Sequence, residues 1–429
     1  MSGPISRRWQ VIRLIVIWLL AVSASAKAEF RVGVAARSII PKPLLPLSGG
    51  MGPSSPAKAV RGDLSARALV MQSGEIKVAI VSVDVLGFPA VLGNRARAQI
   101  KNIPPTHVVI GASHTHSAPD CYAFPDGQGG HTGDLRYMEM VCDRIVEAVN
   151  EADGNLRDAQ LRIATGKVEG RVAYNYYAPD LYDRRASVIQ AVDTLDKPMV
   201  TLVNYAVHPE VLGAASGICS PDLVGPLRDH IEQSVGGMAM FMNGAQGGMV
   251  TADNRDLDRP SDAQRGYWND RRTWEECIRI GTTLGQESLR IINQSPAQAD
   301  PKLRCLVAQA RFPVDSDELW SVVQHSPLKY PHNDDRSITS QLNLIELGSA
   351  RILTIPGEAL PNIGFYLKRK MGGRHNLLFG LTNDAFGYIL TKEDFMSFER
   401  YEYISRVSLG EGTGDILVEQ ALELVKRVK

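Results

Sequence analysis

The chain has 429 residues, and its 47 basic side chains are matched by 47 acidic ones. Because no excess of positive charge is present to neutralise phosphates, the composition argues against a dedicated nucleic-acid-binding protein. The length suits one large domain or two to three average ones, and no internal repeat divides it.

The first 28 residues have the pattern of a secretory signal peptide. Arg7, Arg8 and Arg13 form a basic segment, an apolar run follows from Leu14 to Val22, and Ala24-Ser25-Ala26 fits a small-x-small cleavage site. The apolar run is short for a membrane span. We therefore expect residues 1–28 to be removed, leaving a secreted or periplasmic protein made of a single large domain, residues 29–429.

The N-terminal half predicts strands that end near polar residues. Strands are expected at 30–35, 66–71 and 77–85, with a Pro- and Gly-rich loop at 41–56. Gly50 in that loop is a candidate substrate contact because glycine lets a backbone approach a ligand closely. Asp84 lies at the end of an apolar strand, so it is either a substrate contact or a turn residue.

The stretch Ser113-His114-Thr115-His116-Ser117-Ala118-Pro119 follows a short apolar strand over 107–110. Side chains at positions i and i+2 of a strand share a face, so both imidazoles can reach one cavity. Neutral imidazole is a common zinc ligand, but two ligands do not make a zinc site.

The rest of the chain predicts an α/β fold with mixed sheets flanked by helices. Helices are expected at 92–100, 135–151, 221–234, 274–292 and 414–428, and strands at 161–170, 199–207, 238–242, 303–313, 340–347 and 351–355. The segments 253–272 and 315–336 are polar and are expected to be loops. A glycine-rich loop after residue 242 makes Gly247 a second candidate substrate contact, through its backbone N–H.

Three further polar residues lie near the ends of predicted strands. His208 ends Ala206-Val207-His208-Pro209, Glu358 ends Pro356-Gly357-Glu358, and Tyr388 follows Gly380-Leu381-Thr382-Asn383. Two histidines and a carboxylate are a common catalytic zinc set, and open α/β sheets place their sites at strand ends.

In these motifs, and in their order along the chain, the sequence resembles the catalytic domain of the neutral/alkaline non-lysosomal ceramidases. The resemblance implies a zinc-dependent amidohydrolase that cleaves the N-acyl amide of ceramide-like lipids by activating water. It implies that zinc is held by His114, His208, Glu358 and Tyr388, with His116 and Tyr401 beside the reacting carbonyl. A lipid substrate would also bring the protein into peripheral contact with a membrane.

Two departures from the family pattern affect the predicted substrate. The family carries a catalytic serine in a Gly-Asp-Val-Ser-Pro loop, whereas this chain has Gly247-Gly248-Met249-Val250-Thr251. The serine position falls on Val250, or on Thr251 after a one-residue shift, and only Thr251 could donate a hydrogen bond. The family's C-terminal immunoglobulin-like domain is also not expected here.

The altered loop leaves two other functions open. The protein is either a zinc hydrolase of a smaller amide or ester, or a pseudoenzyme that keeps the metal without turnover. The sequence does not specify the oligomeric state, and other divalent ions suit the same ligands.

Overall fold

Three larger β-sheets form the framework of the protein. The computed structural model describes residues 30–126, 128–262 and 267–428, so the predicted signal peptide at 1–28 lies outside the described residues. The first sheet has the strand order β6-β5-β4-β1-β8, the second β14-β12-β11-β9 and the third β18-β19-β20-β22. Their bounds are β1 Phe30–Ser38, β4 Ser65–Ser73, β5 Ile76–Val83, β6 Val108–Ala112, β8 Arg157–Asp158, β9 Gln160–Lys167, β11 Arg185–Val192, β12 Pro198–Tyr205, β14 Met238–Asn243, β18 Leu303–Pro313, β19 Ser337–Leu347, β20 Ala350–Thr354 and β22 His375–Phe379.

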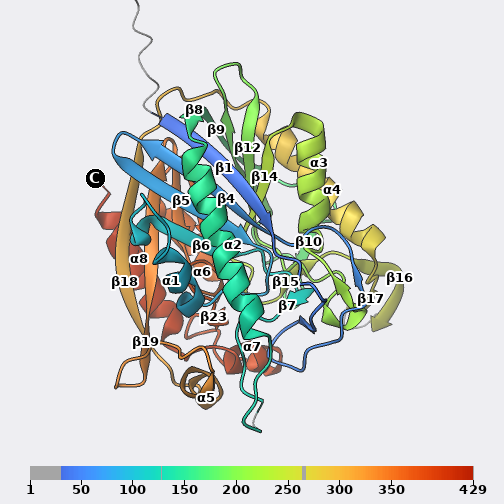
Figure 1. The fold of residues 1–429 in the computed structure, drawn as a ribbon. Coiled ribbons are helices and arrows are strands. Elements are labelled where there is room, and N and C mark those ends of the chain that lie inside the picture. The colour runs from blue at the N-terminus through green and yellow to red at the C-terminus, as the bar shows by residue number, and fades with distance from the viewer. Residues whose placement is uncertain (1–29, 127, 263–266, 429) are drawn as a thin grey trace, which may run out of the picture.

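Helices cover the outer faces of these sheets (Figure 1). The helix α2 packs on the first sheet, α3 and α4 on the second, and α6 and α8 on the third. The helical segments are α1 Ala90–Arg97, α2 Leu135–Gly154, α3 Val224–Val235, α4 Trp274–Ile292, α5 Asp317–His325, α6 Pro361–Met371, α7 Glu402–Arg406 and α8 Thr413–Lys426, with 3₁₀ turns at Pro105–His107, Ala214–Ser216 and Glu399–Tyr401.

The inner faces of the three sheets share one apolar core. Ile80 of the first sheet, Leu202 of the second and Ile352 of the third belong to the same cluster and are fully buried. Burial of apolar surface on both faces is the main free-energy gain available to such sheets. The predicted α/β fold with mixed sheets flanked by helices is therefore confirmed, and the described residues form no immunoglobulin-like sandwich.

Each larger sheet contains one parallel pair of strands. These pairs are β5 with β6, β12 with β14, and β20 with β22, while the other ladders in the sheets are antiparallel. Parallel neighbours end at the same edge of a sheet, so the segments after β6, β12, β20 and β22 emerge together. Short strand pairs then connect these segments: β2 Leu47–Ser48 with β7 Ala118–Pro119, β3 Ala59–Val60 with β13 Ile218–Cys219, β10 Ala173–Asn175 with β15 Val250–Ala252, and β21 Glu358–Ala359 with β23 Tyr388–Ile389.

Two asparagines join the sheets at this edge. The Asn204 side-chain amide donates to the carbonyls of Met242 and Leu378, which links the second and third sheets at 2.9 and 2.8 Å. The Asn243 amide donates to the carbonyls of Ser113 and Val207, which links the segments after β6 and β12. Because all these groups are buried, their hydrogen bonds hold the strand ends in fixed relative positions.

Two segments predicted to be loops contain regular structure. Residues 253–272 include the antiparallel strands β16 Arg255–Asp262 and β17 Tyr267–Asp270, which pair with an irregular register. The sequence of these strands shows no alternation of apolar and polar residues that would have predicted them. Residues 315–336 include α5, which is capped by Ser316 accepting from the Leu319 N–H, with two acidic residues in its first turn. The sequence analysis also missed β11 and α6, although Pro361 and Gly372 mark the ends of α6.

None of the described helices combines the length and hydropathy that crossing a bilayer requires. All of the chain's cysteines are described, and each is a free thiol.

Candidate metal centre

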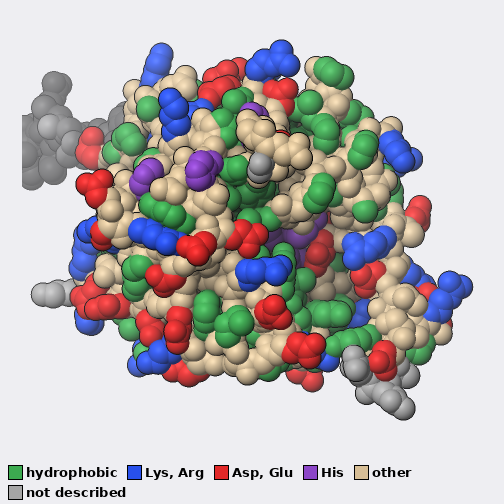
Figure 2. All heavy atoms as spheres, turned by 90° about the horizontal axis from the view of Figure 1, so that it is seen from below, with side chains coloured by type: hydrophobic (Ala, Val, Ile, Leu, Met, Phe, Trp, Pro, Cys, Tyr) green, Lys and Arg blue, Asp and Glu red, His purple; other side chains and the backbone are tan. Residues whose placement is uncertain are grey.

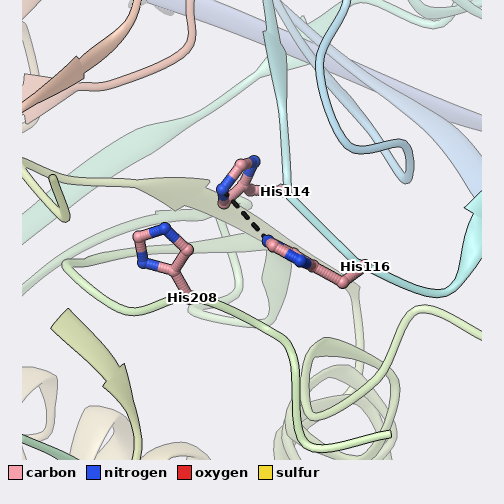
Figure 3. Close-up of side chains that lie close together, drawn as sticks. All are labelled: His114, His116 and His208. Atoms are coloured by element: carbon pink, nitrogen blue, oxygen red, sulfur yellow. Dashed lines mark hydrogen bonds between the residues drawn. The ribbon is translucent and has the colours of Figure 1, made fainter. Parts of the chain in front are cut away.

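Three imidazoles converge where β6 and β12 end (Figure 3). His114 and His116 follow β6, and His208 follows β12. One ring nitrogen from each histidine lies within 4.8 Å of one ring nitrogen of each of the others. The backbone of His114 adopts φ +73°, a conformation that non-glycine residues rarely adopt and that is often found at functional sites.

Glu358 completes this cluster from the third sheet. Its Oε2 lies 3.0 Å from Nε2 of His208 and 3.4 Å from Nε2 of His114. The strand β21 that contains Glu358 pairs in parallel with β23, and this register sets Glu358 directly beside Tyr388. The sequence-predicted ligands His114, His208, Glu358 and Tyr388 are thus brought to one site.

Backbone carbonyls fix the tautomers of two histidines. His114 Nδ1 lies 2.6 Å from the Leu86 carbonyl, and His208 Nδ1 lies 2.9 Å from the Val250 carbonyl. A carbonyl can only accept, so each Nδ1 carries a proton, and each Nε2 is directed towards Glu358.

The site therefore gathers acceptors around one point. Two Nε2 lone pairs and a carboxylate within 3.4 Å repel one another unless a proton or a cation lies between them. Burial disfavours charge on both His208 and Glu358, yet contact with Glu358 raises the pKa of His208, and contact with His114 and then His208 lowers the pKa of Glu358. This set of ligand atoms fits a divalent metal ion, because the other ring nitrogen of both His114 and His208 is already hydrogen-bonded to a backbone carbonyl.

Tyr388 contacts a different partner in the described structure. Its hydroxyl donates to Met249 Sδ at 3.2 Å, and burial together with the charge of Glu358 raises the pKa of this phenol. Met249 belongs to the loop that carries a serine in the resembling family, and its φ is +61°. The side chain that reaches the centre from this loop is thus a thioether, which donates no hydrogen bond.

Neither predicted replacement for the family serine lines the cleft beside the centre. Val250 is fully buried in the core beneath the second sheet. Thr251, the next residue of β15, has the opposite orientation, pairs with Tyr174 of β10 and is absent from the cleft lining. The structure therefore gives no support to the prediction of Thr251 as a catalytic residue.

A large cleft opens beside the imidazoles, with about 1130 Å³ of empty space including its mouth. Leu319, Val322 and Val323 of α5 form one wall. The remaining lining includes Gly50, His116, Tyr330, Ile338, Phe386 and Tyr403. Figure 2 shows hydrophobic side chains and histidine at a hollow in this face, with charges of both signs interspersed around it. The cleft is suited to an apolar chain whose polar end lies at the centre.

Of the three predicted substrate contacts, one lines the cleft and two do not. Gly50 lines it. Asp84 is fully buried, binds Arg228 at 2.8 Å and accepts from the Ser65 N–H, so its role is structural. The Gly247 N–H donates to the Ala359 carbonyl, so it is not free for substrate and instead holds the Glu358 strand.

Tyr401 is replaced at the cleft by a tyrosine that the sequence analysis missed. Tyr401 is buried against Phe398 and Tyr177 and does not line the cleft. Tyr403 lines it instead, with its ring centroid 6.0 Å from that of Tyr388. Residues two apart in a helical segment point in different directions, so only one of the two tyrosines can face the cleft, and the sequence carries no signal that says which.

Solved structures share this fold. No protein-family model matches the chain, and no curated protein matches it in sequence. The structure resembles neutral ceramidase from Pseudomonas aeruginosa, with a TM-score of 0.70, 17% identity, and coverage of 93% of this chain and 75% of that one. A ceramidase complexed with C2 matches with a TM-score of 0.69, at the same identity and coverage. The chain thus has the fold of neutral ceramidase, as the sequence resemblance predicted.

Proposed function

We propose that this protein is a secreted zinc-dependent amidohydrolase that cleaves the N-acyl amide of ceramide-like lipids. The observation that carries the proposal is the convergence of His114, His208 and Glu358 acceptors beside an apolar cleft. The likeness to neutral ceramidase structures supports it through the fold.

His114, His208, Glu358 and Tyr388 would hold the metal, and His116 would lie beside it. A bound zinc ion would polarise the amide carbonyl and make water more acidic. Other divalent ions suit imidazole and carboxylate ligands as well, so the assignment of zinc is part of the proposal.

The chain's own residues bind the substrate and move its protons. The α5 wall takes the acyl chain and excludes water from it. Burial and the neighbouring His114 and His208 lower the pKa of His116, so this imidazole is neutral at pH 7 and can accept a proton. Tyr403 lines the same cleft, and its hydroxyl would donate to the carbonyl oxygen as that oxygen gains charge.

A second candidate is a zinc hydrolase of a smaller amide or of an ester. It is favoured by Met249, which reaches the centre from the loop where the resembling family has its serine. Loss of one hydrogen-bond donor to the developing oxyanion typically lowers the rate by a hundredfold or more. An ester needs less stabilisation of its leaving group than an amide, so it tolerates this loss better.

The domain limits belong to the same proposal. Residues 1–28 would act as the signal peptide, and 29–429 would form one catalytic domain. N-terminal sequencing of the exported protein tests this assignment, since it should begin close to residue 29.

Hydrolysis assays test the function. Zinc-loaded protein would be given a ceramide, a short N-acyl amine and the matching ester, each with and without a chelator. His114→Ala is the test variant, and His131→Ala, at an exposed histidine outside the cleft lining, is its control.

The proposal predicts chelator-sensitive ceramide cleavage that His114→Ala abolishes and His131→Ala retains. Cleavage of only the short amide or the ester would support the second candidate. Zinc binding with no turnover on any substrate would leave the pseudoenzyme and contradict both hydrolases.

A further inference from the structure

A second, polar recess lies across His116 from the apolar cleft. Its empty space amounts to about 840 Å³ including the open side. It shares His116, Tyr403 and residues 49–51 with the apolar cleft, so the two spaces adjoin at these residues. A substrate whose reacting carbonyl lies at the metal centre would therefore extend one half into each space.

The recess is lined mainly by short side chains. Gly213, Ala214 and Ala215 form part of its wall, and Glu210 and Arg272 contribute the charged groups. No long aliphatic wall comparable to α5 is present among the described residues that line it. This half of the site suits a small polar group rather than a second hydrocarbon chain.

Of the two charged groups, the arginine already has a partner. The Arg272 guanidinium binds Asp270 at 2.9 Å, and a second nitrogen donates to the Glu210 carbonyl. Its charge is therefore balanced within the protein.

The Glu210 carboxylate has no such partner. Among the described residues its nearest basic atom is His116 Nδ1, at 3.8 Å, which is beyond hydrogen-bonding distance. The side chain is only 19% exposed, and its backbone is held by a hydrogen bond from its N–H to the His208 carbonyl. A fixed, half-buried carboxylate beside the reacting position attracts positive charge.

We propose that Glu210 selects substrates whose amine half is small and bears a second, positively charged group, as in an N-acyl diamine. This inference rests on the proposed amidase function and favours its second candidate, a smaller amide, because the amine half of a ceramide carries a long hydrocarbon chain. The ammonium would donate to the carboxylate, a charge-assisted contact stronger than one between neutral groups.

The test uses amides that differ only in the end of the amine half. N-octanoyl-1,3-diaminopropane, N-octanoyl-3-aminopropanol and N-octanoyl-β-alanine carry a positive, a neutral and a negative terminus on the same acyl chain. Zinc-loaded wild-type protein, Glu210→Gln and Glu210→Lys would be compared by kcat/KM. Glu75→Gln, at an exposed glutamate in the β4–β5 turn, is the matched control because it changes the net charge equally.

We expect wild type and Glu75→Gln to prefer the diamine amide over the β-alanine amide by about tenfold or more, since one well-placed charge contact has that effect. Glu210→Gln should remove the preference, and Glu210→Lys should reverse it. Equal kcat/KM for the three amides in wild type, or a preference that survives in Glu210→Gln, would overturn the inference.

Binding separates this inference from the proposed function. If none of the amides is hydrolysed, calorimetric titration of the three amides into the metal-free protein replaces the kinetic comparison. A binding preference for the diamine amide that Glu210→Gln removes would support the recess assignment although the amidase function had failed. Binding without a charge preference would refute it.

Discussion

Gly247 offers a test of how the fold positions the metal centre. Its N–H donates to the Ala359 carbonyl, and its α-carbon lies against the backbone of the Glu358 strand. A β-carbon at this position would lie 2.1 Å from the Glu358 carbonyl oxygen, whereas ordinary contacts begin at 3.4 Å. In Gly247→Ala the two backbones must therefore separate by about 1.3 Å, which is 3.4 minus 2.1.

This displacement should affect both stability and the metal centre. Overpacking of a buried site costs about 1–3 kcal/mol in the free energy of unfolding. Displacing a catalytic group by about 1 Å lowers turnover by roughly a hundredfold. Urea denaturation would measure the first effect, and zinc affinity with amide hydrolysis would measure the second.

Gly154→Ala is the matched control. Gly154 ends α2, and a β-carbon there would contact nothing within 4 Å. Because alanine is favoured over glycine in a helix, this variant should be unchanged or slightly stabilised. Wild-type zinc affinity and stability in Gly247→Ala would refute the claim that this contact holds Glu358 in place.

Three further predictions concern other parts of the structure. Burial raises the pKa of Asp222 from 3.8 to about 6, so stability is lost as the pH rises between these two values and stays at the lower level above them. Urea denaturation at pH 5 and 7.5 should show that Asp222→Asn removes about 1 kcal/mol of this loss. An unaltered pH dependence would contradict the burial argument. Asp84→Ala should lower the free energy of unfolding, measured by urea denaturation, by about 3–5 kcal/mol, because it leaves Arg228 buried without its partner. Zinc affinity should stay unchanged. Lost turnover at unchanged stability would instead assign Asp84 a substrate role. Val322→Glu should raise the KM for an octanoyl amide about tenfold or more, because it places a charge in the acyl cleft. Ser321→Glu, at an exposed position of the same helix, should leave this KM unchanged. Equal KM values in the two variants would show that α5 does not bind the acyl chain.

The elements that position the centre were largely predictable from local patterns. Apolar runs followed by His or Glu identified β6, β12 and β20, since a buried strand needs a continuous apolar sequence. The overall fold was predicted from the motifs and their order along the chain, not from hydrophobic periodicity. Parallel pairing between strands far apart in sequence leaves no local signal.

The parts of the site that were missed depend on contacts between distant segments. Tyr401 and Tyr403 are equally plausible by sequence, and only the packing of Phe398 and Tyr177 decides which one is buried. Asp84 resembles a site residue until Arg228, 144 positions away, is seen to neutralise it. The helix α5 was read as a polar loop because its apolar face is short, although its Ser316 cap was visible in the sequence.

Zinc binding by the purified mature protein tests the central claim most directly. Calorimetric titration of zinc into metal-free wild-type protein and into His208→Ala and His131→Ala would measure stoichiometry and affinity together. The account predicts about one zinc ion per chain in wild type and in His131→Ala, with binding lost or weakened by orders of magnitude in His208→Ala. A wild-type protein that binds no zinc, or a His208→Ala variant that binds it as tightly as wild type, would contradict the metal centre.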